Sequence, residues 1–167
     1  MGAGKSSIGR RLANLLDLPF RDTDQVIRER AGVDIDFIFE KEGEAGFRLR
    51  EEKVLAELLA EEPAVIATGG GVVLSAANRE AMKHHGVVVF LETGVDWQLA
   101  RTRLGSHRPL LDTPDPRERL ASIYAERLPL YRECATVTVS TDGRRVAAVA
   151  NAVLDELKKG GYVEHKA

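Results

Sequence analysis

The sequence is 167 residues long, which is enough for one domain with a sizeable hydrophobic core. Its 24 lysines and arginines nearly balance 26 aspartates and glutamates, and the net charge of -2 argues against a nucleic-acid-binding protein. The single cysteine, Cys134, excludes an internal disulfide and a cysteine-rich zinc site. No apolar run approaches the roughly 20 residues that span a bilayer, so we expect a soluble cytoplasmic protein without membrane partners.

Hydrophobic periodicity predicts short strands that alternate with longer helices along the chain. In chain order we expect a helix at 5–16, a strand at 19–21, helices at 25–30, 35–42 and 44–62, a strand at 64–68, a helix at 75–85, a strand at 87–92, a helix at 95–104, a polar stretch at 105–116, a helix at 117–133, a strand at 135–140 and a helix at 146–159. This alternation predicts a single α/β domain over residues 1–167, with three layers and helices on both faces of a parallel sheet. Ligands of such folds bind beyond the carboxyl ends of the strands.

The first candidate motif is G-A-G-K-S-S at residues 2–7, which matches the second half of the phosphate-binding loop G-x-x-x-x-G-K-[ST]. Glycines let backbone N–H groups surround phosphate oxygens, and the following helix N-terminus favours negative charge. Lys5 would add a positive charge, and Ser6 is placed to bind Mg²⁺. The alternative is a flexible glycine-rich terminus, but the helix expected to begin at Lys5 favours the phosphate loop.

The second motif is Asp22-Thr23-Asp24, which follows the first expected strand. One carboxylate could hold a water of the Mg²⁺ shell, and the other could accept the hydroxyl proton of an acceptor substrate. Alternatively, Asp24 caps the helix that follows. The residues alone leave both interpretations open.

The third motif is a run of three glycines, Gly69 to Gly71, after the strand expected at 64–68. Such a run indicates a backbone that another group approaches closely, or one that adopts positive φ. A simple turn rarely needs three glycines, so we favour a loop that faces the substrate.

Three arginines, Arg48, Arg108 and Arg127, complete the candidate set. Guanidinium groups match carboxylates and phosphates with paired hydrogen bonds, although each arginine alone would suit a solvated surface. Arg108 lies in the polar stretch 105–116, and stretches of this length in compact domains are often lids or disordered segments. A lid would exclude water and so prevent hydrolysis of ATP in place of transfer.

These motifs, in this order, resemble the shikimate kinase family over nearly the whole chain. The phosphate-loop fragment is common to many kinases, whereas F-R-x-x-E followed by G-G-G, R-P-L-L and R-x-P-L-Y is specific in combination. The resemblance implies a monomeric, Mg²⁺-dependent enzyme that phosphorylates the 3-hydroxyl of shikimate with ATP. This reaction belongs to the biosynthesis of chorismate and the aromatic amino acids.

The resemblance also implies roles for individual residues. Shikimate would contact Asp24, Arg48, Gly70 and Arg127, and an anionic acceptor explains the need for two arginines. Mg²⁺ would be bound by Ser6 and, through water, by Asp22. The catalytic residues would be Lys5, Asp24 and the lid residue Arg108. ATP would contact Gly2, Ala3, Gly4, Lys5, Ser6, Ser7, Arg101, Arg108 and Arg144, with Arg101 and Arg144 flanking the adenine.

The sequence departs from the family pattern at its beginning. The resemblance implies a further apolar strand and the first loop glycine before Met1, and that strand is central in a sheet of order 2-3-1-4-5. We therefore expect that the two halves of the sheet are separated in this chain and that Met1 is not the working start. Two other interpretations stay open, namely another small phosphate-loop kinase, such as a gluconate kinase, and a non-catalytic nucleotide-binding remnant.

Overall fold

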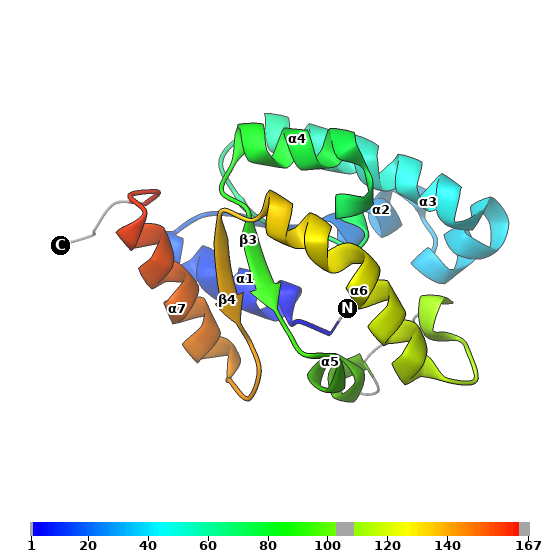
Figure 1. The fold of residues 1–167 in the computed structure, drawn as a ribbon. Coiled ribbons are helices and arrows are strands. Elements are labelled where there is room, and N and C mark those ends of the chain that lie inside the picture. The colour runs from blue at the N-terminus through cyan, green and yellow to red at the C-terminus, as the bar shows by residue number, and fades with distance from the viewer. Residues whose placement is uncertain (1, 103–108, 164–167) are drawn as a thin grey trace.

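A computed structural model describes residues 2–102 and 109–163, and strands alternate with helices throughout (Figure 1). The elements in order are α1 (Lys5–Leu16), β1 (Phe20–Asp22), α2 (Thr23–Ala31), α3 (Ile35–Ala60), β2 (Val65–Ala67), the 3-10 helix η1 (Val72–Leu74), α4 (Ala76–His85), β3 (Val89–Glu92), α5 (Val95–Thr102), the 3-10 helix η2 (Pro109–Leu111), α6 (Pro116–Cys134), β4 (Val137–Ser140) and α7 (Val146–Lys159). None of the described helices is both long enough and apolar enough to cross a membrane.

The four described strands form two parallel pairs. In the first pair Phe20 of β1 lies opposite Val65 of β2, and in the second Val89 of β3 lies opposite Val137 of β4. Within the described residues no ladder joins β2 to β3, and a cavity of about 280 Å³ lies between these strands, α1 and α7. The pairs match the two outer halves of the order 2-3-1-4-5 that the resemblance implies.

Helices cover both faces of the second strand pair, as the alternation of side chains along β3 shows. Val89 and Leu91 pack against the core between α1 and α7, which includes Ile8 and Val153. Phe90, on the opposite face, stacks on the Tyr131 ring of α6 with ring centroids 5.1 Å apart. This arrangement is the expected three-layer α/β fold, because a strand buried on both faces needs apolar residues at consecutive positions.

The start of α2 corrects one expectation. Asp22, not Asp24, caps this helix, because its Oδ1 accepts hydrogen bonds from the backbone N–H of Asp24 at 3.0 Å and of Gln25 at 3.3 Å. The interpretation of Asp24 as the cap is therefore wrong. Asp24 lies in the first helical turn, and its side chain lies next to Gly69 in the site described below.

The two helices expected at 35–42 and 44–62 are present as the two parts of α3, on either side of the non-helical residue Gly43. Gly43, with φ 69° and ψ -178°, lies at the kink. A left-handed φ is inexpensive only for glycine, so this residue allows the chain to turn between the two helical parts. The second part carries Phe47, Val54 and Leu58 into the core that it shares with α2.

Candidate active site

The phosphate-loop fragment leads directly into α1. Gly2 and Gly4 have φ values of 67° and 81°, in the left-handed region that suits glycine. A methyl group on Gly2 would lie 2.6 Å from the carbonyl oxygen of Gln98, so this loop packs closely on the backbone of α5. No side chain among the described residues caps α1, and its first N–H groups, beginning near Lys5, are therefore suited to an anion.

A serine hydroxyl and a carboxylate oxygen meet beside this loop. Ser6 Oγ donates a hydrogen bond of 2.6 Å to Asp22 Oδ2, while the other oxygen of Asp22 caps α2. The described residues contain no cluster of three or more histidine, cysteine, aspartate or glutamate side chains suited to a metal. The pair of oxygens nevertheless fits Mg²⁺, which commonly takes one or two protein ligands and completes its shell with water and phosphate.

The glycine run at 69–71 brings the acceptor side of the site together. A methyl group on Gly69 would lie 2.6 Å from Glu51 Oε1 and 3.4 Å from Asp24 Oδ1, and one on Gly71 would overlap the Arg48 guanidinium. None of the three glycines has positive φ. At Gly69 and Gly71, close approach by neighbouring side chains, and not backbone conformation, therefore favours glycine.

Arg48 is held against this loop by two carboxylates. Its Nη1 lies 2.7 Å from Glu51 Oε2, and its Nη2 lies 3.0 Å from Glu44 Oε1. Burial lowers the pKa of Arg48, but the two carboxylates outweigh it and raise the pKa above its usual value. The guanidinium therefore stays charged, and the ion pairs fix its position.

Glu51 is a site residue to which the sequence analysis gave no role. Its side chain is fully buried, and within the described part of the chain its Oε1 has no hydrogen-bond partner. Burial raises the pKa of Glu51, opposed by Arg48 and Arg127 and assisted by the negative charge of Asp24. The signal for this residue was the spacing F-R-x-x-E, which places Glu51 one helical turn after Arg48.

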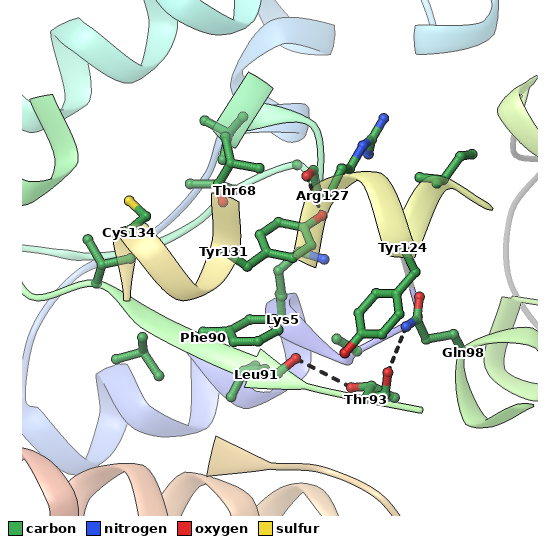
Figure 2. A pocket seen from close by; sticks show the side chains of 18 of the residues that line it. Lys5, Thr68, Phe90, Leu91, Thr93, Gln98, Tyr124, Arg127, Tyr131 and Cys134 are labelled. Atoms are coloured by element: carbon green, nitrogen blue, oxygen red, sulfur yellow. Dashed lines mark hydrogen bonds between the residues drawn. The ribbon is translucent and has the colours of Figure 1, made fainter. Parts of the chain in front are cut away.

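Arg127 reaches the same region from α6. Figure 2 shows it with Tyr131, Lys5 and Thr68 around a cavity of about 90 Å³. Arg127 is only 5% exposed, and its Nε has no hydrogen-bond partner among the described residues. Buried donors are rarely left unpaired, so this nitrogen indicates a place for an acceptor group from a ligand.

Two further predicted residues, Arg101 and Arg144, lie in α5 and just before α7. Arg101 donates hydrogen bonds to the carbonyl oxygens of Gly2 at 3.2 Å and Thr141 at 3.0 Å, and it lies over the Trp97 ring. Arg144 instead donates to the backbone carbonyl oxygens of Ser140, at the end of β4, and of Ala148, in the first turn of α7. Arg108, with residues 105–107 of the expected lid, lies outside the described residues.

A phosphoryl donor at the start of α1 and an anionic acceptor between Arg48 and Arg127 would both lie beyond the carboxyl ends of parallel strands. This arrangement defines a small-molecule kinase with a phosphate-binding loop. A family model described as shikimate kinase matches residues 1–158, and the chain belongs to this family.

Curated relatives support the same family assignment. Curated shikimate kinases from Halorhodospira halophila and Vibrio campbellii are 53% identical over 158 residues and 52% identical over 159 residues. These alignments cover 95% of this chain in both cases, and 89% and 92% of the respective relatives. The comparison favours the shikimate kinase interpretation over the gluconate kinase alternative.

Solved structures give the same result for the fold. A shikimate kinase from Acinetobacter baumannii, solved in complex with shikimate, matches this chain with a TM-score of 0.93 and 44% sequence identity. The match covers 96% of this chain and 89% of the Acinetobacter chain. The Aquifex aeolicus shikimate kinase has a TM-score of 0.82 and 32% identity, with coverages of 97% and 94%. The predicted family and fold class are therefore confirmed.

Proposed function

We propose that this protein transfers the γ-phosphoryl group of ATP to the 3-hydroxyl of shikimate, as a cytoplasmic monomer in the biosynthesis of chorismate and aromatic amino acids. The observation that carries the proposal is the buried Arg127, whose Nε is unpaired within the described residues and which lies near the Arg48–Glu51 ion pair. Two guanidinium groups, of Arg127 and of Arg48, on either side of Glu51 suit the carboxylate of shikimate better than they suit a neutral sugar.

On the donor side, Lys5 neutralises charge on the β- and γ-phosphates of ATP, while backbone N–H groups at Gly2 to Gly4 contact phosphate oxygens. Ser6 and Asp22 would hold Mg²⁺, which when bound draws the phosphate oxygens into position and offsets their charge. Their hydrogen bond of 2.6 Å places the two oxygens side by side before any metal binds. Arg101 and Arg144 would contact the adenine.

On the acceptor side, Arg48 and Arg127 bind the carboxylate, and Asp24 and the Gly70 backbone orient the ring hydroxyls. The 3-hydroxyl oxygen then forms a bond to the γ-phosphorus as the bond to the bridging oxygen of ADP breaks. Asp24 accepts the hydroxyl proton. Phosphoryl transfer depends mainly on positioning and charge stabilisation, which is what these residues supply. Arg108 would add charge stabilisation from the lid.

A coupled assay of ADP release with shikimate and Mg-ATP tests the proposal. We expect release that depends on shikimate, and a loss of roughly 10- to 100-fold in kcat/KM for Arg127→Gln, because a charged hydrogen bond to substrate is removed. Arg132→Gln is the matched control, since Arg132 lies on the same helix, is 63% exposed and pairs with Glu92. A rate of ADP release that does not depend on shikimate, or that requires gluconate instead, would contradict the proposal.

A further inference from the structure

Tyr131 lies next to the proposed acceptor site and is not among the residues assigned to it above. It follows Arg127 by four positions on α6, so the two side chains share one face of the helix. Its ring stacks on Phe90 of β3, with an interplanar angle of 22°. The strand therefore fixes the ring, and the phenol oxygen has a defined position beside the cavity (Figure 2).

The Tyr131 hydroxyl joins two parts of the site that are distant in sequence. It donates a hydrogen bond of 2.5 Å to the carbonyl oxygen of Gly70, a residue 61 positions earlier in the chain. Burial raises the pKa of Tyr131, while the positive charge of the nearby Arg127 guanidinium works in the opposite direction. The phenol therefore stays protonated near neutral pH and remains a donor to Gly70.

The carbonyl of Gly70 determines the direction of the next N–H group. The structure contains no cis peptide among its described residues, so the N–H of Gly71 points away from the Gly70 oxygen. Glycine backbones rotate more freely than others, and these glycines lack side chains that would restrict them. Besides Tyr131, the hydrogen bond from the Gly69 N–H to Thr23 Oγ1, at 3.3 Å, is a further anchor of the run.

We propose that Tyr131 is a positioning residue for acceptor binding, in that its hydroxyl holds the Gly70 carbonyl and so sets the orientation of the Gly70–Gly71 peptide beside Arg127. With the Gly70 carbonyl held by Tyr131, the N–H of Gly71 keeps one direction in the glycine run on the acceptor side of the site. The inference rests on the proposed function, because it assigns Tyr131 to the acceptor side of that reaction. If the inference is right, removal of the Tyr131 hydroxyl weakens binding of the acceptor and leaves binding of ATP unchanged.

Tyr131→Phe is the variant that separates positioning from packing, because it keeps the ring on Phe90 and removes only the hydroxyl. We expect the KM for shikimate to rise about tenfold, as for loss of a hydrogen bond to a charged group, with the KM for ATP unchanged. A purely structural role would lower the active fraction, and hence kcat, and would leave both KM values unchanged. Tyr162→Phe, at a 48% exposed tyrosine that does not line this cavity, is the control.

A second measurement tests the loop directly, without substrate. In the full chain labelled with ¹⁵N, Tyr131→Phe should shift the amide resonance of Gly71 and speed its hydrogen exchange, and Tyr162→Phe should do neither. Wild-type KM values and an unchanged Gly71 amide in Tyr131→Phe would overturn the inference. A wild-type protein that releases no ADP with shikimate would instead overturn the proposed function, so the two failures are distinguishable.

Discussion

Arg48 and Glu51 form an ion pair in which only the arginine reaches solvent. The atoms Nη1 and Oε2 lie 2.7 Å apart, with the side chain of Arg48 21% exposed and that of Glu51 fully buried. A buried carboxylate paired on only one oxygen costs folding free energy, but its ion pair holds the Arg48 guanidinium beside the glycine run. Glu51 thus connects the stability of α3 to the geometry of the acceptor site.

The first prediction concerns the pH dependence of stability. Burial raises the pKa of Glu51 above that of the unfolded chain, so the folded protein binds this proton more tightly. Protonation of Glu51 therefore makes its whole contribution to the free energy of unfolding at pH values below the ordinary glutamate pKa. That contribution is lost as the pH rises from there through the raised pKa of the folded protein. Glu51→Gln lacks this contribution. Urea unfolding of both proteins across that pH range should show the wild type losing stability relative to the variant as pH increases.

A stability difference between wild type and Glu51→Gln that stays constant over this range would contradict the raised pKa. Glu44→Gln is a useful comparison, because Glu44 also pairs with Arg48 but its side chain is 46% exposed. Solvent screening weakens such an exposed pair, so we expect Glu44→Gln to change the free energy of unfolding little at neutral pH.

The second prediction concerns the glycine run. A methyl group on Gly71 would overlap the guanidinium of Arg48, and Gly71→Ala should displace that side chain. We expect the KM for shikimate to rise about tenfold or more, because small displacements of a binding group are costly, while the KM for ATP stays unchanged. Gly86→Ala is the control, since its added methyl would meet only the carbonyl oxygen of Met82, at 3.9 Å. Equal KM values for both variants would show that Arg48 is not displaced.

The third prediction concerns Mg²⁺. Asp22→Asn keeps a good helix cap for α2, because asparagine and aspartate cap about equally well. It removes the carboxylate that accepts the hydrogen bond from Ser6. If Asp22 holds Mg²⁺ through water, the apparent Mg²⁺ affinity in the ADP-release assay should fall about 10- to 100-fold, with little change in thermal stability. An unchanged Mg²⁺ titration would remove Asp22 from the proposed metal site.

The fourth prediction uses the single tryptophan of the sequence. Trp97 is 46% exposed, and the guanidinium carbon of Arg101 lies 5.8 Å from its ring centroid. If Arg101 contacts the adenine, titration with Mg-ATP should change the Trp97 emission and saturate, and Arg101→Leu should weaken that response. Shikimate alone should have little effect on this signal. A response to shikimate and none to ATP would place the nucleotide elsewhere.

Much of the fold was predictable because its signals are local. The helices at 5–16 and 146–159 have the expected bounds, since each shows a regular apolar face and the second is followed by a glycine. The break at Gly43 was predictable too, because this glycine lies between two helical patterns and is the non-helical residue within α3. The choice of Asp22 over Asp24 as the cap depends on φ and ψ at Asp22, which the residue type leaves open.

The candidate site was predictable where a motif carries its chemistry, as in the phosphate loop. Glu51 and Tyr131 were not assigned, because their roles depend on burial and on contacts between distant segments. The spacing of Glu51 after Arg48 is visible in the sequence, but its complete burial is not. Tyr131 meets Gly70 across 61 residues, and no spacing rule predicts such a contact.

Identification of the phosphorylated product tests the central claim most directly. The protein is incubated with Mg-ATP and shikimate, and the products are followed by ³¹P NMR and mass spectrometry. We predict a phosphate monoester on the 3-hydroxyl of shikimate, formed in equal amount with ADP and strongly reduced in Arg127→Gln. Formation of ADP and free phosphate without a phosphorylated shikimate, or of no ADP at all, would contradict the proposed function.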